Sequence, residues 1–111
     1  MQTAAMEDFL KLDIRVGTVV AAKVFEKARK PAYQLQIDFG PELGLKRSSA
    51  QITQRYTPEE LIGKQVLAVV NFPSRQIADF MSEVLVLGTY SEGGVVLITP
   101  DKPAQNGDRL G

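Results

Sequence analysis

Alternating apolar and polar positions predict much of the secondary structure of this chain. The alternation is strictest over residues 33–39, where single polar residues separate Tyr33, Leu35, Ile37 and Phe39. A period of two predicts a strand with one buried and one exposed face. Residues 14–24 are rich in β-branched side chains and predict a longer strand, in which Gly17 is expected to mark a bulge or a sharp coil.

A short helix is predicted between the third and fourth strands. Residues 45–52 predict the third strand, and the next element begins at Thr57. Thr57 is a typical N-cap, Pro58 suits the first helical position, and Glu60 can complete a capping box. Gly63 is expected to end this helix after a turn or two.

The second half of the chain predicts further strands. Residues 66–70 are apolar at every position, which is typical of a strand buried on both faces. Residues 71–81 predict a loop. Residues 84–87 and 95–98 predict two strands on either side of a turn at residues 91–94.

The order of these elements predicts the fold class. A short N-terminal helical segment, with Met6, Phe9 and Leu10 on one face, precedes three strands, a short helix and two strands, and an extra β arm follows at about residues 89–111. This is the chain order of an OB-fold, a small Greek-key barrel, although periodicity alone also allows other small barrels. We therefore expect one all-β domain over residues 1–111.

The composition excludes several kinds of active site. The chain has 111 residues, of which 44% are hydrophobic, and it has no cysteine and no histidine. Disulfides, zinc sites built on these residues, cysteine nucleophiles and histidine bases are therefore excluded. No motif gathers the remaining Lys, Tyr, Ser and carboxylate groups, so we expect a binding protein that is not an enzyme and uses no cofactor.

The charge balance bears on partners and location. Lys+Arg and Asp+Glu both count 13, so the formal net charge is zero and any nucleic-acid binding depends on a local patch. The first residues carry neither a basic region nor a long apolar stretch, and no apolar run approaches the length of a membrane span. We expect a cytoplasmic protein that does not insert into membranes.

Several motifs resemble one family of OB domains. Residues 13–17 (Asp-Ile-Arg-Val-Gly), 56–64, 69–75 and 82–87 resemble the first strand, the helix with its exit, and the fourth and fifth strands of the tRNA-binding OB domain. That domain occurs alone or appended to some methionyl- and phenylalanyl-tRNA synthetases. The resemblance extends over nearly the whole chain, from about residue 9 to residue 110, and implies an OB barrel.

Two segments, residues 48–53 and 68–73, resemble one branch of this family in particular, the chaperones of bacterial protein secretion. The stand-alone tRNA binders usually carry a Val-Ser-Gly-like sequence where this chain has Ser48-Ser49-Ala50. The resemblance implies a homodimer whose C-terminal strands help form the interface. It also implies binding of unfolded or export-bound polypeptides and association with the preprotein translocation ATPase, with tRNA as the alternative ligand.

Polar and cationic residues near the expected ligand face are candidates for tRNA contacts, because OB-folds bind ligands on the second and third strands and the adjoining loops. The candidates are Lys46, Arg47, Ser49, Arg55, Asn71, Arg75 and Ser82. Each also has a structural interpretation, such as a solvated strand face, a surface ion pair of an arginine with Glu59 or Asp79, or loop hydrogen bonds of Asn71. The first loop adds the cations Lys27, Arg29 and Lys30, which are either solvated or ligand contacts.

Apolar residues of the predicted loop at 71–81 are candidates for a peptide site. They are Phe72, Ile77, Phe80 and Met81. A shallow apolar pocket there could accept varied side chains, or the same residues could seal the end of the barrel. Tyr33 could stack on a base, although its place on the apolar face of its strand favours core packing.

Overall fold

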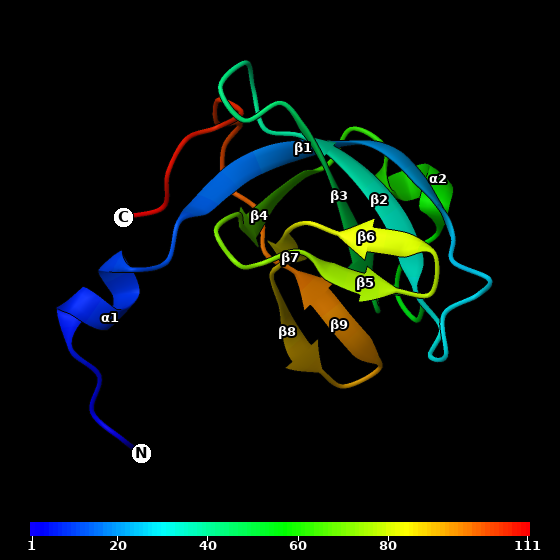
Figure 1. The fold of residues 1–111 in the computed structure, drawn as a ribbon, viewed down its shortest axis with the longest axis horizontal. Helices are drawn as coiled ribbons and strands as arrows, with labels where there is room; N and C mark the ends of the chain where they lie inside the picture. The colour runs from blue at the N-terminus through cyan, green and yellow to red at the C-terminus, as the bar shows by residue number, and fades with distance from the viewer.

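The longest strand, β1, organises the sheet in the computed structural model, which describes residues 1–111. β1 (Ile14–Val24) pairs along its first half with β4 (Gln65–Val69) and along its second half with β2 (Tyr33–Asp38), antiparallel in both cases. β3 (Leu45–Ala50) lies beyond β2 and β7 (Leu85–Val86) lies beyond β4, so the order is β3-β2-β1-β4-β7 (Figure 1). This curled sheet is the predicted OB-type barrel.

Two short helices flank this sheet in the predicted places. α1 (Met6–Leu10) precedes β1, and α2 (Pro58–Leu61) lies between β3 and β4 (Figure 1). The hydroxyl of Thr57 accepts a hydrogen bond from the N–H of Glu60 at 3.4 Å, as expected of an N-cap, and Leu61 is fully buried in the core. Neither helix is long and apolar enough to cross a membrane.

The core divides into two layers on either side of β4. Every residue from Val66 to Val69 is buried, because Val66 and Ala68 join the main core while Leu67 and Val69 join a second cluster. The alternating residues of β2 point into the main core as predicted. The prediction that residues 66–70 form a strand buried on both faces is therefore confirmed for β4.

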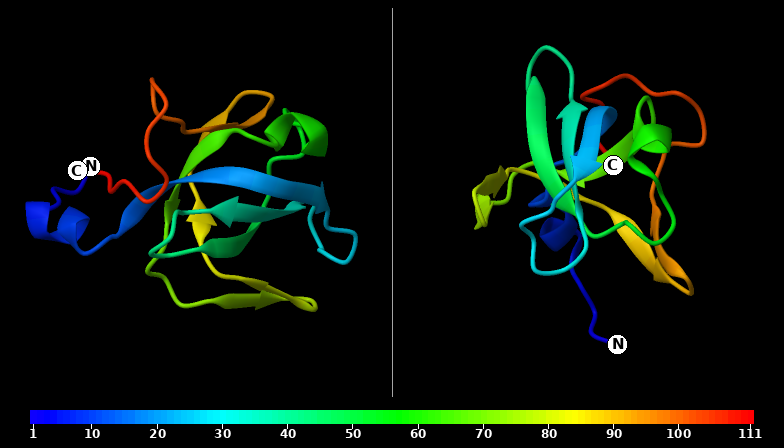
Figure 2. Two further views of the ribbon diagram at one scale, coloured as in Figure 1. Left: turned by 90° about the horizontal axis from the view of Figure 1, so that it is seen from above. Right: turned by 90° about the vertical axis from the view of Figure 1, so that its right-hand side faces the viewer.

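The C-terminal segment closes the second cluster by running beside the start of β1 (Figure 2). The N–H of Val16 donates to the carbonyl of Asp108 at 2.9 Å, and the N–H of Leu110 donates to the carbonyl of Ile14 at 2.8 Å. Beside these bonds, Arg15 forms a forked pair with Asp13, and this hydrogen bonding raises the pKa of Arg15. Asp13 also forms an ion pair with Arg109, with 3.7 Å between Oδ1 and Nε. Main-chain and ionic contacts therefore tie the C-terminal segment to the start of β1.

Gly17 is not the site of the predicted bulge. The register between β1 and β2 shifts between Val19 and Ala21, so the extra residue is Val20. Gly17 is instead a point of close approach, since an added Cβ would lie 2.6 Å from Cγ2 of Ile37 and 2.7 Å from Cε1 of Phe39. Glycine is needed there because the strand presses against the core.

The predicted loop at residues 71–81 is wrong in its second half. β5 (Arg75–Ile77) and β6 (Phe80–Ser82) form a separate two-stranded hairpin. The C-terminal strands also pair differently from the prediction, which placed strands at residues 84–87 and 95–98 on either side of one turn. β8 (Gly88–Ser91) pairs with β9 (Gly94–Leu97), and residues 85 and 86 pair with β4. Two hairpins therefore project from the barrel beside β7 (Figure 1).

Replacing Gly17 with alanine tests the close approach to the core. We expect Gly17→Ala to lower the free energy of unfolding by about 1–3 kcal/mol, because the new methyl group overpacks a fully buried site. Urea denaturation measures this loss. The double variant Gly17→Ala/Phe39→Leu is expected to lose less than the sum of the single variants, whereas Gly17→Ala with wild-type stability would contradict the packing described.

Candidate functional site

The β5–β6 hairpin is held against the loop that joins β1 to β2. Phe25, Ala32 and Phe80 form an apolar cluster apart from the main core, with the two aromatic rings edge to face at 5.4 Å. The ammonium of Lys27 donates to Asp79 at 2.9 Å, which raises the pKa of Lys27 and lowers that of Asp79. Phe80, a candidate peptide contact, is 7% exposed and packs the hairpin against the loop between β1 and β2.

Strand alternation decides which hairpin residues face the barrel. Arg75 pairs with Ser82, and Ile77 pairs with Phe80, so these cross-strand pairs share one face. Since Phe80 is buried beneath the hairpin, this face is the inner one. Met81 belongs to the opposite face and is exposed, so this candidate peptide contact points away from the other apolar candidates.

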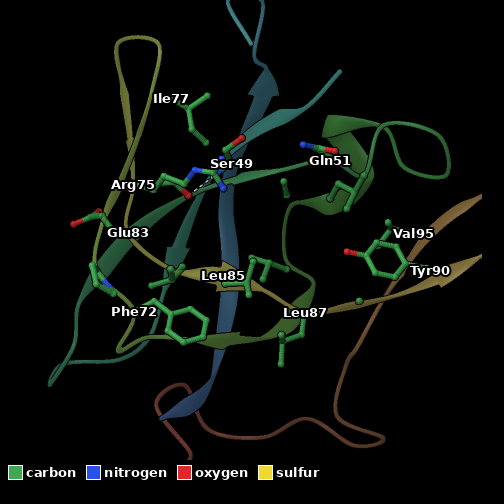
Figure 3. Close-up of a pocket in the computed structure, with 17 residues that line it drawn as sticks. Ser49, Gln51, Phe72, Arg75, Ile77, Glu83, Leu85, Leu87, Tyr90 and Val95 are labelled. Atoms are coloured by element: carbon green, nitrogen blue, oxygen red, sulfur yellow. Dashed lines mark hydrogen bonds between the residues drawn. The ribbon is translucent and has the colours of Figure 1, made fainter. Parts of the chain in front are cut away.

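Side chains from residues 82 and 83 cap the free edge of β3. The hydroxyl of Ser82 accepts a hydrogen bond from the N–H of Ser49 at 3.0 Å (Figure 3). The carboxylate of Glu83 accepts from the N–H of Arg47 at 3.0 Å, and the Arg47 guanidinium lies 5.4 Å from the centre of the Phe80 ring. Lys46 lies on the opposite face of β3, because neighbouring strand residues alternate, so Lys46 and Arg47 do not form one cationic pair.

Two other candidate tRNA contacts are held by distant parts of the chain. The side chain of Asn71 accepts a hydrogen bond from the N–H of Asp13 at 2.9 Å and donates to the carbonyl of Lys11 at 2.8 Å. The Arg55 guanidinium donates to the carbonyl of Glu92 at 2.9 Å, at the tip of the β8–β9 hairpin. Asn71 therefore fixes the entry to β1, and Arg55 fixes the arm.

A cleft of about 590 Å³ opens between the two hairpins, beside β7 and the end of β3. Its apolar lining includes Phe72, Leu85, Leu87, Tyr90 and Val95 (Figure 3). The side chain of Tyr90 is fully exposed, and those of Phe72 and Leu85 are almost half exposed. The cleft is therefore an apolar surface open to solvent, and such a surface on a small domain is typical of an interaction site.

Two charged side chains line the cleft, and only one of them has a partner within the chain. Glu83 is its one lining carboxylate, and Arg47 engages it through a hydrogen bond and an ion pair with 3.6 Å between Nε and Oε1. Arg75 is its one lining cation, and its guanidinium makes neither a hydrogen bond nor an ion pair within the chain. The cleft therefore presents one free positive charge at the edge of an apolar wall.

The cleft brings together candidates from both predicted sites. Those that line it are Ser49, Phe72, Arg75, Ile77 and Ser82. Those that do not are Lys46, Arg47, Arg55, Asn71, Phe80 and Met81. Sequence reasoning missed the lining residues Leu85, Leu87, Tyr90 and Val95, because an unbroken apolar run such as residues 84–87 does not tell which side chains turn outward.

A second, shallower groove of about 410 Å³ lies on the outer face of the sheet. It is lined by Lys23, Gln34, Gln36 and Arg47, with Phe80 of the hairpin at its edge. This is the strand face on which OB-folds commonly bind ligands. Its lining combines two cations and two amides with the apolar residues Ala21, Ala22 and Leu35.

The sequence and the fold place the chain in a known class. The family model "Putative tRNA binding domain" matches residues 14–109, and the chain belongs to this family of OB domains. Within it, the chain is similar to two solved CsaA chaperones. The one from Picrophilus torridus is 51% identical with a TM-score of 0.94, over 98% of this chain and 100% of that chain. The one from Bacillus anthracis is 56% identical with a TM-score of 0.92, over 99% and 100%.

Methionine–tRNA ligases are also similar to the chain, but over a small part of their length. The ligase of Parabacteroides distasonis is 41% identical over 106 residues, which are 94% of this chain and 15% of the ligase. That of Archaeoglobus fulgidus is 37% identical over 106 residues, which are 96% of this chain and 16% of the ligase. The likeness therefore concerns one domain of those enzymes.

Proposed function

We propose that this protein is a non-catalytic binding module that holds unfolded, export-bound polypeptides in the apolar cleft. The observation that carries the proposal is the cleft itself, an open apolar wall around Phe72, Leu85 and Tyr90. The similarity to CsaA chaperones supports it. Protein secretion as the setting, the cytoplasm as the location and the preprotein translocation ATPase as a partner form part of the same proposal.

The size and composition of the cleft suit transient binding of extended chains. Burying one large apolar side chain contributes about 1.5–3 kcal/mol, and ordering a flexible polypeptide offsets much of the sum. A few such side chains on Leu85, Leu87 and Phe72 therefore give weak, reversible binding. Adaptable apolar contact without a deep pocket also tolerates many sequences, which a chaperone requires.

The β8–β9 arm supports a homodimer. It forms a sheet of its own, and β8 is exposed along its whole length. An isolated two-stranded hairpin is marginally stable, and a free strand edge invites pairing with another chain. We therefore propose that residues 89–111 contribute to an interface with a second copy, which would present two identical clefts.

The oligomeric state is measured by sedimentation equilibrium. At micromolar concentration we expect twice the monomer mass of 12.2 kDa. Thr89→Asp is expected to shift the protein toward the monomer by placing a charge on the face of β8 opposite Tyr90 and the cleft. Because Thr89 is exposed, the substitution leaves the fold intact. A wild-type protein that sediments as a monomer would contradict the dimer.

Binding of tRNA is the second candidate function. The family match favours it, and the outer groove with Lys23, Gln34, Gln36 and Arg47 offers polar and cationic groups for it. The cations Arg29 and Lys30 of the neighbouring loop are exposed. Such binding would depend on phosphate contacts and would weaken steeply with salt.

Matched substitutions separate the two functions. We expect Leu85→Ser and Phe72→Ser to weaken binding of a fluorescently labelled, unfolded precursor polypeptide about five- to tenfold, through lost apolar contact. Met81→Ser removes a similarly exposed apolar side chain outside the cleft and is expected to leave this affinity unchanged. Fluorescence anisotropy measures the dissociation constants.

The same variants titrated with tRNA over a salt series complete the test. Leu85→Ser is expected to leave any tRNA affinity unchanged, because the outer groove does not include Leu85. If the wild-type protein binds tRNA tightly, with a steep salt dependence, and fails to bind the unfolded polypeptide, that result contradicts polypeptide binding and supports tRNA binding as the function. If Met81→Ser and Leu85→Ser lose the same affinity for the unfolded polypeptide, the cleft is not its binding site.

A further inference from the structure

Arg75 is the one cation of the cleft, and neither the apolar wall nor the fold accounts for its charge. The two carboxylates at residues 79 and 83 already have partners: Asp79 pairs with Lys27, and Glu83 pairs with Arg47. The Arg75 side chain is exposed and unpaired, yet the register of the hairpin turns it toward the cleft, on the same face as Ser82.

The position of Arg75 is fixed by its surroundings. Its cross-strand partner Ser82 accepts the hydrogen bond from Ser49, and two places along the strand Ile77 pairs with the buried Phe80. The base of the hairpin is therefore anchored to the barrel. In Figure 3 Arg75 lies at one end of the cleft, with Phe72, Leu85 and Leu87 along the wall and Tyr90 and Val95 at the other end.

We infer that Arg75 makes the cleft selective for extended polypeptide segments in which an acidic side chain flanks a cluster of apolar side chains. This inference rests on the proposed polypeptide-binding function. The apolar side chains would cover Leu85, Leu87 and Phe72, and the carboxylate would receive the free guanidinium donors, which can bind it through two parallel hydrogen bonds. Covering the apolar wall excludes water and strengthens the ion pair relative to one in bulk solvent.

The apolar wall favours a polypeptide over a nucleic acid as the partner of Arg75. A nucleic-acid backbone carries a charge at every phosphate, and phosphates laid along Leu85, Leu87 and Phe72 would lose solvation without gaining a partner. A peptide with a single carboxylate can place that charge beside the Arg75 guanidinium and cover the apolar wall with uncharged side chains. The charge of Glu83 does not compete, because Arg47 already engages it.

Three labelled peptides test this selectivity. The peptides are ten residues long and differ only at the position after a Leu-Leu-Phe cluster, which is Asp, Asn or Lys. All their other side chains are uncharged. At low salt we expect the wild-type protein to bind the Asp peptide about three- to fivefold more tightly than the Asn peptide and to bind the Lys peptide least. Fluorescence anisotropy gives the affinities.

Charge reversal at Arg75 provides the decisive comparison. Arg75→Gln is expected to bind the three peptides equally, and Arg75→Glu to prefer the Lys peptide. Lys64→Glu makes the same change in net charge as Arg75→Glu, at an exposed residue outside the cleft, and is expected to keep the preference for Asp. Circular dichroism confirms that each variant is folded.

The outcomes separate this inference from the proposed function. Equal affinity of the wild-type protein for all three peptides, or an Asp preference that survives in Arg75→Glu, would overturn the role of Arg75 while leaving polypeptide binding intact. Absence of binding to every peptide and to the unfolded precursor would overturn the proposed function itself. If tRNA competes with the peptides for the wild-type protein and for Lys64→Glu but not for Arg75→Gln, RNA is the partner of Arg75 and the inference is overturned.

Discussion

The close approach of β1 to the core at Gly17 is the constraint on which the barrel depends. An added Cβ at this position would meet Ile37 and Phe39, both fully buried. Because the strand lies this close to the core, its first half can pair with β4 while its second half pairs with β2. The bulge at Val20 follows just beyond the contact, where the strand turns from one partner to the other.

The candidate site depends on a second, smaller set of contacts at the rim of the barrel. The aromatic pair of Phe25 and Phe80 holds the β5–β6 hairpin over the barrel, and the bond between Ser49 and Ser82 joins its base to β3. With the hairpin in this place and the β8–β9 arm on the other side, Leu85 and Leu87 of the intervening segment remain open to solvent at the cleft. Phe25 and Phe80 therefore lie outside the cleft, whereas Ser49 and Ser82 both join the hairpin to β3 and line the cleft.

Periodicity predicted the elements whose pattern is set by the core. The alternation over residues 33–39 reflects one face of β2 packed on the main core, and the unbroken apolar run at residues 66–70 reflects the place of β4 between two clusters. The order of these elements indicated an OB-fold, and the structure has the predicted order of three strands, a short helix and a fourth strand. The resemblance to a family of OB domains is confirmed by the family match.

The site was less predictable because its determinants are distant contacts. The strands of the β5–β6 hairpin have three residues each, too few for a period to show, and their place depends on Phe25 in another loop. Asn71 and Arg55 were candidates for ligand contact, but their partners are main-chain groups far away in the sequence. Met81 and Phe80 are neighbours in the chain, and only the register of the hairpin shows that they face opposite ways.

In the proposed function the apolar cleft, and not the outer face of the sheet, receives an unfolded polypeptide. Hydrogen–deuterium exchange of the protein, alone and with a saturating unfolded precursor, tests it most directly, because bound chain shields the amides that it covers. We expect slower exchange at residues 49–52 and 84–88, which line the cleft, and unchanged exchange at residues 34–36 of the outer groove. Slower exchange at residues 34–36 with unchanged exchange along the cleft would contradict it.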